Sequence, residues 1–525
     1  MIHPRFGVGT FWSLGAACEL FGAKYPTAPL GLITVAALLP AAWTIRLVDR
    51  NVETLCDDDL DWADLVMIGG MLPQIFDLLD TIDQCRARGK PVVVGGPAVT
   101  SLPESFNKAN FRVLGEAEDI IQEFIAAWEA GATEGIFEAK KFQIDVTKTP
   151  VPRFDLLKFE NYLYIGVQFS RGCPFTCEFC DIIELYGRNP RAKTSEQMLR
   201  ELETLYRLGY RGPIDFVDDN LIGNKKAVKA FLPELKAWLE QHDYPFEFTT
   251  EASLNLADDA DLLRLLYEAN FIGVFIGIES PDDATLVAMR KKQNTRRNIT
   301  QSIHKIYAAG LFVTAGFIVG FDTEKGSVAD GIIDLIEDAA IPICMIGLLH
   351  ALPNTQLTRR LASEGRLHAE FFFDRVVGMD QCTQGLNFDT LRPRREILSD
   401  FKHVLEEVYE PAAFAERLQR LTRLLGPANP KRRNDTRSKL GGLEIIARIL
   451  SQLPGEQDLF KRTIVECAST KPQWARVILL LIAFYLHLGP FSRHVIRQIE
   501  QRVESDQDVA YLARPSQQRD VSVTA

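Results

Sequence analysis

Three cysteines stand close together in the segment SRGCPFTCEFC, where Cys173, Cys177 and Cys180 have the spacing C-x3-C-x2-C. Thiolates are soft ligands that suit zinc or an iron-sulfur cluster, and a short loop carrying three of them can surround one metal centre. A structural zinc would need a fourth ligand nearby, but the first histidine after the loop is His242 and the first cysteine is Cys344. The spacing therefore favours a [4Fe-4S] cluster in which one iron keeps an open position.

Polar side chains follow several of the strands that we expect beyond this loop. They are Asp218, Asp219 and Asn220, then Glu251, then Glu279 with Ser280, and finally His350. The carboxyl ends of the strands form the active site of a βα barrel, so these side chains should gather around the cysteine loop. Their oxygens could accept hydrogen bonds from an ammonium group or from sugar hydroxyls. Capping of the next helix explains Asp218 or Ser280 equally well.

The elements that must position these residues fall into two βα alternations. The first predicts a doubly wound parallel sheet in a domain at residues 1–147, and a proline-marked linker, KTPVPRF, follows it. The second, at residues 155–385, predicts six strands, which suit a partial (β/α)6 barrel better than a full eight-stranded one. We expect these strands at Tyr164–Phe169, Ile214–Val217, Phe246–Thr250, Val274–Ile278, Phe312–Val319 and Cys344–Leu349.

Helical patterns alone continue after the barrel. They predict a C-terminal helical region at 386–505, a solvated basic loop at Lys431–Lys439 and a disordered tail at 506–525. The apolar run Val477–Leu488, interrupted only by His487, is shorter than the roughly 20 residues that span a bilayer. A buried helix is the simplest interpretation, and the alternative is an interfacial helix or a lid over an apolar substrate.

Glycines end three strands of the first domain. They are Gly69 and Gly70, Gly95 and Gly96, and Gly115, which precedes Glu116. Ligands bind at the carboxyl edge of a parallel sheet, and glycines admit a bulky ligand close to the backbone, although a Gly-Gly pair is as often a tight turn. The chain has no GxGxxG or Walker pattern in this domain, so neither a nicotinamide nor ATP is indicated.

Composition narrows the class of partners. The net charge of -11 disfavours a large phosphate-binding surface, so we expect no nucleic acid. Nine cysteines, of which three are clustered, argue against a disulfide framework. No secretory signal stands at the N-terminus, so we expect a cytoplasmic protein without a transmembrane segment and with at most a peripheral membrane contact.

The cysteine spacing, with Phe179 before the last cysteine, resembles the radical S-adenosylmethionine (SAM) superfamily. This resemblance implies that the open iron binds the amino and carboxylate groups of SAM. An electron from a donor such as flavodoxin or ferredoxin then cleaves SAM to a 5'-deoxyadenosyl radical. By the same resemblance, 218–220 occupy the place of the amino-group motif, without its glycines, Gly277–Ser280 looks like the ribose-contacting segment, and Gly316 with Ile318 looks like the GxIxG motif beside adenine.

The first domain resembles the cobalamin-binding domain of B12-dependent radical SAM enzymes. APLGLITVAALLP, LVDRN, DLVMIGGML, PVVVGGPAVT and FRVLGEAED occur in that order. The resemblance implies that cobalamin lies at the glycine-bearing edge. It would lack a histidine lower ligand, because no Asp-x-His-x-x-Gly precedes residue 150. Pro4 stands where the family's first strand should be ending, so we expect that strand to be missing. The C-terminal helices resemble the extension of a subgroup that includes hopanoid methylases.

Together these resemblances imply cobalamin-dependent methyl transfer to an unactivated carbon of a small or lipid-like substrate. Oxidative cyclisation or ring rearrangement without methylation is the first alternative. An RNA methylthiotransferase, with Cys18, Cys56 and Cys85 as ligands of a second cluster, and a non-catalytic cobalamin or redox sensor are the others. Cys344 is expected to be a buried core residue.

Overall fold

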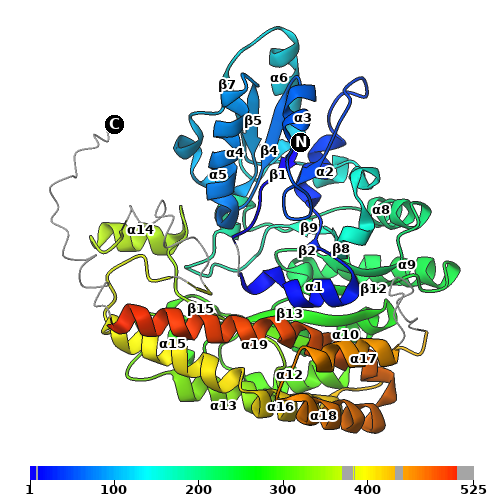
Figure 1. Cartoon of the computed structure of the whole chain (residues 1–525), viewed down its shortest axis with the longest axis vertical. Coiled ribbons are helices and arrows are strands. Elements are labelled where there is room, and N and C mark those ends of the chain that lie inside the picture. Colours follow the sequence, from blue (N-terminus) through cyan, green and yellow to red (C-terminus); the bar gives the residue numbers. More distant parts are fainter. Residues whose placement is uncertain (8–9, 369–381, 384, 432–441, 505–525) are drawn as a thin grey trace.

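The computed structural model describes residues 1–7, 10–368, 382–383, 385–431 and 442–504. An N-terminal sheet with its helices lies at the top of Figure 1, a curved sheet lies in the middle, and the C-terminal helices lie along the bottom. The expected basic loop, apart from Lys431, and the expected tail fall outside the described residues.

Six parallel strands form the N-terminal sheet in the order β3-β1-β4-β5-β6-β7. They are β1 (Ile2–His3), β3 (Val48–Asp49), β4 (Val66–Gly69), β5 (Val92–Gly95), β6 (Phe111–Leu114) and β7 (Gly135–Glu138). Helices α2 (Leu30–Ala36), α3 (Asp57–Trp62), α4 (Ile75–Ala87), α5 (Pro97–Ser101) and α6 (Ala117–Glu129) connect them. The central strands β4 and β5 are continuously apolar because both of their faces are buried: Ile68 and Val94 pack in one core cluster, whereas Met67 and Val93 pack in another.

The expectation that the first strand of this sheet is missing was wrong. Ile2 pairs in parallel with Val48 of β3 and with Ile68 of β4, so β1 occupies the position between them. A strand of two residues has too little periodicity to be recognised in a sequence. Its neighbour β3 is equally short, since only Val48–Asp49 is extended.

Seven parallel strands form the curved sheet, in the order β15-β14-β13-β12-β11-β8-β2. The six expected strands are β8 (Tyr162–Val167), β11 (Gly212–Phe216), β12 (Phe246–Glu251), β13 (Phe271–Glu279), β14 (Phe312–Val319) and β15 (Cys344–Leu348). Their connecting helices include α8 (Ser195–Arg207), α9 (Lys225–Gln241), α10 (Ala260–Glu268), α11 (Asp283–Ala288), α12 (Ile299–Ala308) and α13 (Ala329–Ala339). The partial barrel is therefore confirmed, with one additional strand.

The additional strand, β2 (Tyr25–Thr27), comes from the part of the chain assigned to the first domain. Tyr25 pairs with Tyr162 of β8. Next to it, α1 (Gly15–Phe21) lies beside the long C-terminal helix α19 (Ala475–Glu504), as Figure 1 shows. Residues 10–27 thus belong to the barrel and the helical region, so the first domain is not the continuous segment 1–147. A three-residue strand that contains a proline carries no recognisable strand pattern.

The C-terminal region is helical, as expected. After α14 (Gln356–Ser363), which precedes the expected region, it contains α15 (Arg394–Val408), α16 (Pro411–Leu424), α17 (Gly442–Ser451), α18 (Gln457–Thr470) and α19. The apolar run is part of α19. Among the described residues, the segment 472–503 is the one helix whose length and composition would allow it to cross a membrane, but 61% of its most apolar window is buried within the molecule. This burial supports the interpretation as a core helix.

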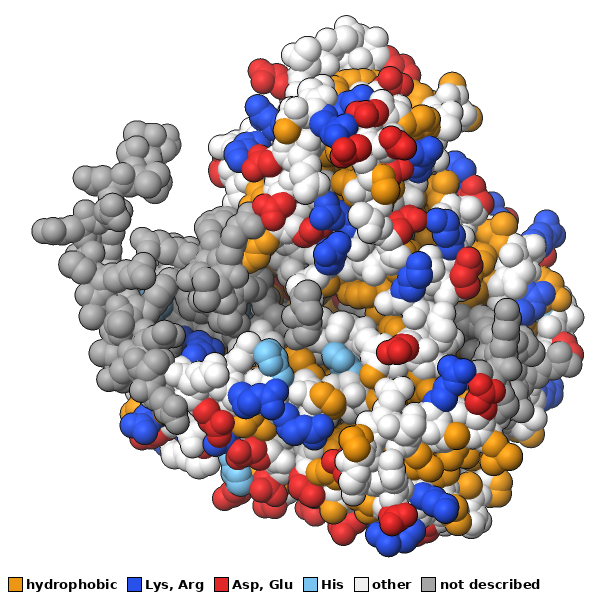
Figure 2. Space-filling view, in the orientation of Figure 1, with side chains coloured by type: hydrophobic (Ala, Val, Ile, Leu, Met, Phe, Trp, Pro, Cys, Tyr) orange, Lys and Arg blue, Asp and Glu red, His pale blue; other side chains and the backbone are white. Residues whose placement is uncertain are grey.

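Charged side chains of both signs are interspersed over the face in Figure 2. Such a mixture is typical of an ordinary solvated surface rather than of one that binds a phosphate backbone.

Candidate functional site

The cysteine loop leaves the carboxyl end of β8 and reaches α7 (Ile182–Leu185). Gly172, just before the first cysteine, has a φ of 96°, and a Cβ there would lie 2.9 Å from the carbonyl oxygen of Gly187. The backbone N–H of Cys173 donates to that same oxygen at 3.2 Å. Only glycine allows the two chain segments to approach this closely, so the turn places Cys173 at the mouth of the barrel.

The three loop cysteines are free, with Cys177 buried and the other two half-buried. Two side-chain amides donate toward their sulfurs: Asn220 Nδ2 lies 3.9 Å from Cys173 Sγ, and Gln293 Nε2 lies 3.7 Å from Cys177 Sγ. Burial raises the pKa of the Cys173 and Cys180 thiols. N–H groups aimed at sulfur are the surroundings that thiolate ligands of iron-sulfur clusters have, so the residues present fit a cluster.

Among the described residues, no group of three or more histidine, cysteine, aspartate or glutamate side chains could hold a single metal ion. This is expected if the cysteines hold a cluster, because each thiolate then binds a different iron. The three cysteines considered for a second cluster lie on separate elements: Cys18 is in α1, Cys56 precedes α3, and Cys85 is in α4. They do not form a site.

The two aspartates after β11 hold the cysteine loop by its backbone. Asp218 accepts hydrogen bonds from the backbone N–H of Phe169 at 2.9 Å and from the hydroxyl of Ser170 at 2.6 Å. Asp219 accepts one from the N–H of Gly172 at 2.7 Å. Burial raises the pKa of Asp218 to about 6 and that of Asp219 to about 7. Both carboxylates therefore position the cysteine loop rather than standing free to accept a hydrogen bond from a ligand.

Glu279 lies at an irregular point of β13. The register with β14 shifts between Gly277 and Glu279, and Glu279 has a φ of 71°. Its carboxylate accepts a hydrogen bond from Lys291 Nζ, which also lies 5.9 Å from the ring centroid of Phe179. A Cβ at Gly277 would collide with Glu279 and Lys291. The strand end therefore carries a buried ion pair beside the cysteine loop.

The segment that supplies Lys291 and Gln293 was missed from the sequence. It reads KKQNT, which contains no recognised motif, and it follows α11. Asn294 donates to the carbonyl oxygens of Gly277 and Ile278 at 3.0 and 3.1 Å, which ties the segment to the end of β13. Polar residues buried in a loop leave no periodic signal, so nothing in the sequence pointed to them.

Other expected site residues lie at the same end of the barrel. Ser280 Oγ accepts from the N–H of Asp282 at 3.2 Å, but the N-cap of α11 is Asp282, so Ser280 does not cap the next helix. Gly316 lies beside Phe275, since a Cβ there would be 3.1 Å from the ring, and Ile318 is buried on β14. Burial lowers the pKa of His350 to about 4, so this imidazole is neutral.

Glu251, at the end of β12, has a buried oxygen, Oε2, with no hydrogen-bond partner among the described residues. Burial and then the charge of Asp215 raise its pKa well above the usual value. Asp215 itself accepts a hydrogen bond from the Thr249 hydroxyl at 2.6 Å. This carboxyl pair could accept hydrogen bonds from a cationic or hydroxylated group in the barrel.

The glycine-bearing edge of the first domain is closely packed. A Cβ at Gly96 would be 3.1 Å from the carbonyl oxygen of Gly70, and one at Gly115 would be 3.2 Å from Ala139. Side chains at Gly69 and Gly95 would likewise meet neighbours at 3.1 and 3.3 Å. These glycines therefore allow the strand ends to pack closely, in addition to any role in admitting a ligand.

Glu116, at the same edge, faces the cysteine loop. It accepts hydrogen bonds from Arg171 Nη1 at 3.1 Å and from Arg191 Nη1 at 2.8 Å, while Glu118 pairs with Arg171 Nη2 at 2.6 Å. The carboxyl edge of the first sheet and the mouth of the barrel are thus joined by buried ion pairs. A ligand at the glycine-bearing edge would lie next to a cluster at the loop.

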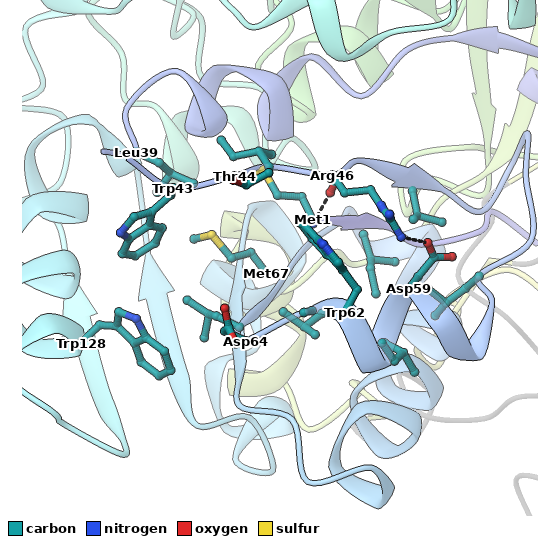
Figure 3. A pocket seen from close by; sticks show the side chains of 18 of the residues that line it. Met1, Leu39, Trp43, Thr44, Arg46, Asp59, Trp62, Asp64, Met67 and Trp128 are labelled. Atoms are coloured by element: carbon teal, nitrogen blue, oxygen red, sulfur yellow. Dashed lines mark hydrogen bonds and ion pairs between the residues drawn. The ribbon is translucent and has the colours of Figure 1, made fainter. Parts of the chain in front are cut away.

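A pocket of about 470 Å³ lies at the opposite edge of the N-terminal sheet, by the amino ends of β1 and β4. Trp43, Trp62, Trp128 and Met67 are among the side chains that line it (Figure 3). Its lining contains none of the expected site residues, so it is separate from the candidate site.

Comparisons with known proteins agree with this architecture. Residues 167–336 match the Radical SAM superfamily, and residues 355–501 match a domain of unknown function, DUF4070. The chain is 47% identical to the uncharacterized methyltransferase sll1242 of Synechocystis over 81% of this chain and 78% of that protein. It is 35% identical to the hopanoid C-2 methylase of Rhodopseudomonas palustris over 84% of this chain and 83% of that protein.

Two solved structures share the fold. OxsB, a cobalamin-dependent radical enzyme with aqua-cobalamin and SAM bound, aligns with a TM-score of 0.58 at 15% identity, covering 98% of this chain and 82% of its own. TsrM from Kitasatospora setae, with cobalamin and a [4Fe-4S] cluster bound, aligns with a TM-score of 0.54 at 14% identity, covering 69% and 74%.

Proposed function

The chain belongs to the B12-binding-domain radical SAM enzymes, in the group of methyltransferases that includes hopanoid C-2 methylase. We propose that it methylates an unactivated carbon of a polycyclic, lipid-like substrate. The cofactors of this family are a [4Fe-4S] cluster, SAM and cobalamin. When bound, the cluster and SAM supply a hydrogen-abstracting radical, and cobalamin supplies the methyl group.

In this proposal Cys173, Cys177 and Cys180 hold the cluster. Asp218 and Asp219 fix the loop that carries them, because their carboxylates accept hydrogen bonds from its backbone. In the same proposal SAM is surrounded by Phe179 of the cysteine loop and by residues of the barrel strands and their ends: Asn220, Glu251, Glu279, Ser280, Gly316 and Ile318. The glycine-bearing edge, comprising Gly69, Gly70, Gly95, Gly96, Gly115 and Glu116, faces cobalamin. His3, the one histidine before residue 150, does not stand in an Asp-x-His-x-x-Gly motif, so in this proposal cobalamin binds without the histidine lower ligand that the motif supplies.

The observation that carries the proposal is the contact of Glu116 and Glu118 with Arg171. Arg171 lies two residues before Cys173, and Glu116 follows the glycine at the end of β6. The two groups that must act on one substrate carbon would therefore lie on facing surfaces. A substrate held between them would be shielded from water, which limits side reactions of a radical.

Aromatic side chains beside the site support an apolar substrate. Phe275 and Glu279 lie on the same side of the sheet, because a Cβ at Gly316 would be 3.1 Å from the Phe275 ring and 3.9 Å from Glu279 Oε2. The rings of Trp12 and Phe275 are 5.7 Å apart, and Trp12 remains 48% exposed. Such a surface suits a fused hydrocarbon ring system. The name of the 35% identical relative, a hopanoid methylase, points in the same direction.

The segment that carries Trp12 is held by the C-terminal region. His487 Nε2 lies 3.0 Å from the carbonyl oxygen of Thr10 and 3.4 Å from the hydroxyl of Ser13. Its ring stacks on Phe491. The one polar residue in the apolar run thus anchors the aromatic wall of the proposed substrate site.

The test is turnover by anaerobically purified full-length protein, reconstituted with iron, sulfide and cobalamin. A pentacyclic hopanoid and SAM with a deuterated methyl group would be added, with flavodoxin, the proposed physiological donor, or dithionite as reductant. We expect 5'-deoxyadenosine and a product that has gained the labelled methyl group. A dehydrogenated or rearranged product without the label would favour the cyclisation alternative. Failure to form 5'-deoxyadenosine with any reductant would favour a sensor.

A further inference from the structure

We propose that Gln293 and Asn220 raise the reduction potential of the cluster by donating N–H···S hydrogen bonds to Cys177 and Cys173. This inference rests on the proposed function, because it requires that the three cysteines hold a cluster. It concerns two side chains that reach two different thiolates, one from the segment after α11 and the other from the end of β11.

The Gln293 amide is buried and directed at sulfur. Its side chain is 9% exposed, and its Nε2 lies 3.7 Å from Cys177 Sγ. A thiolate accepts hydrogen bonds but cannot donate one, so the NH2 end of the amide must face it. The other end, Oε1, has no partner among the described residues. Burial of an amide with an unpaired oxygen is costly, which argues that the contact to Cys177 is retained for a purpose other than stability.

The backbone around Gln293 is fixed on both sides. Asn294 is fully buried and binds two carbonyl oxygens at the end of β13. On the other side, the N–H of Glu178, inside the cysteine loop, donates to the carbonyl oxygen of Met289 at 3.0 Å. The segment 289–294 is therefore attached to both the barrel and the loop. Because the segment is held on both sides, the Gln293 side chain keeps its buried position.

Asn220 makes the corresponding contact from the end of β11. Its Nδ2 lies 3.9 Å from Cys173 Sγ and 3.0 Å from the hydroxyl of Ser253, and its Oδ1 accepts from the N–H of Ser253 at 3.2 Å. Both ends of the amide are thus oriented by the loop after β12. Asn220 is the weaker donor of the two, because it is shared and its distance to sulfur is longer.

These hydrogen bonds act on the electron that enters the cluster. Reduction adds one negative charge, and N–H groups directed at the thiolates stabilise that charge, so they make the potential less negative. Such outer contacts are known to alter the properties of a metal centre strongly. Removing a donor should therefore make the cluster harder to reduce without changing the number of iron atoms it contains.

The experiment is an EPR-monitored redox titration of anaerobically reconstituted full-length protein without SAM, together with iron and sulfide analysis. The variants are Gln293→Met, which keeps the length of the side chain but has no donor, and Gln293→Glu, which keeps its shape. Gln301→Met is the matched control, because Gln301 is exposed on α12. We expect unchanged iron content, a midpoint potential shifted to more negative values in both Gln293 variants, and no shift in the control. Adding Asn220→Asp to Gln293→Met should shift the potential further.

A potential in Gln293→Met equal to that of the wild type would overturn the inference while leaving the proposed function intact. Loss of iron from both Gln293 variants would also overturn it, because Gln293 would then be needed for cluster assembly. If the wild-type protein itself takes up zinc or no metal, the proposed function fails, and the two failures are distinguished by the metal analysis.

Discussion

Arg171 and Glu116 join the first domain to the cysteine loop through a buried ion pair, with Nη1 and Oε1 3.1 Å apart and side chains only 13% and 4% exposed. Glu118 shares the same guanidinium. Although burial disfavours its charge, the pKa of Glu118 is lowered by Arg171. Charges that are this buried are stable only when paired, so each domain stabilises the other at this point.

Replacing Glu116 with Gln should weaken this connection. Arg171 would keep Glu118, but Arg191 would lose its carboxylate partner, so we expect the free energy of unfolding to fall by about 1–3 kcal/mol. Thermal unfolding of the apo-protein measures this change, and cobalamin uptake after reconstitution should fall with it. Glu104→Gln is the control, because the Glu104 side chain is 89% exposed beside Arg112 in the same domain. Equal melting temperatures for the two variants would show that the pair contributes nothing.

If the three loop cysteines hold the cluster, replacing them should remove iron, whereas replacing a cysteine elsewhere should not. Alanine at Cys173, Cys177 or Cys180 should abolish the iron-sulfur absorbance of reconstituted protein, because each thiolate holds its own iron. Cys56→Ala should leave iron content unchanged, since Cys56 is exposed and far along the chain from the loop. Iron that persists in all three loop variants would contradict the assignment. Loss of iron in Cys56→Ala would revive the second-cluster alternative.

Trp12 is expected to contribute to substrate binding. Removing its ring in Trp12→Ala should raise KM for a polycyclic substrate about tenfold, which corresponds to ~1.4 kcal/mol, with little change in the cluster spectrum. The matched control is Trp62→Ala, whose ring is 45% exposed on the N-terminal domain. His487→Ala should have a smaller effect in the same direction, because it loosens the segment that carries Trp12. An unchanged KM in Trp12→Ala would place the substrate elsewhere.

The raised pKa of Asp215 predicts that the folded protein loses stability as the pH rises. Burial raises its pKa from 3.8 to about 6, so the folded protein binds a proton that the unfolded chain releases. Its stabilising contribution is complete below about pH 4 and is lost as the pH rises through about 6. Asp215→Asn should therefore melt at a higher temperature than the wild type at pH 7.5 and at a similar temperature at pH 4.5.

The control for this prediction is Asp334→Asn, at an exposed position of α13, which should change the melting temperature equally at both pH values. A lower melting temperature for Asp215→Asn at pH 7.5 would mean that the carboxylate is stabilised by its surroundings, contrary to the expected effect of burial.

The sequence by itself determined the features that depend on neighbouring residues. The βα alternation placed all six main barrel strands, because buried parallel strands are continuous apolar runs. The spacing of Cys173, Cys177 and Cys180 identified the loop as a metal-binding candidate, since one short segment carries all the relevant atoms. The residues at the strand ends could be placed near the loop because parallel strands share one carboxyl edge.

Only the tertiary structure decided which of those residues contact one another. Asp218 and Asp219 are occupied by the loop backbone, Glu279 is paired with Lys291, and Gln293 reaches Cys177, although 116 residues separate them. The short strands β1 and β2 are stabilised by their neighbours rather than by a pattern of their own. Contacts between distant segments depend on how whole helices and strands pack, and a single sequence does not show which distant residues come into contact.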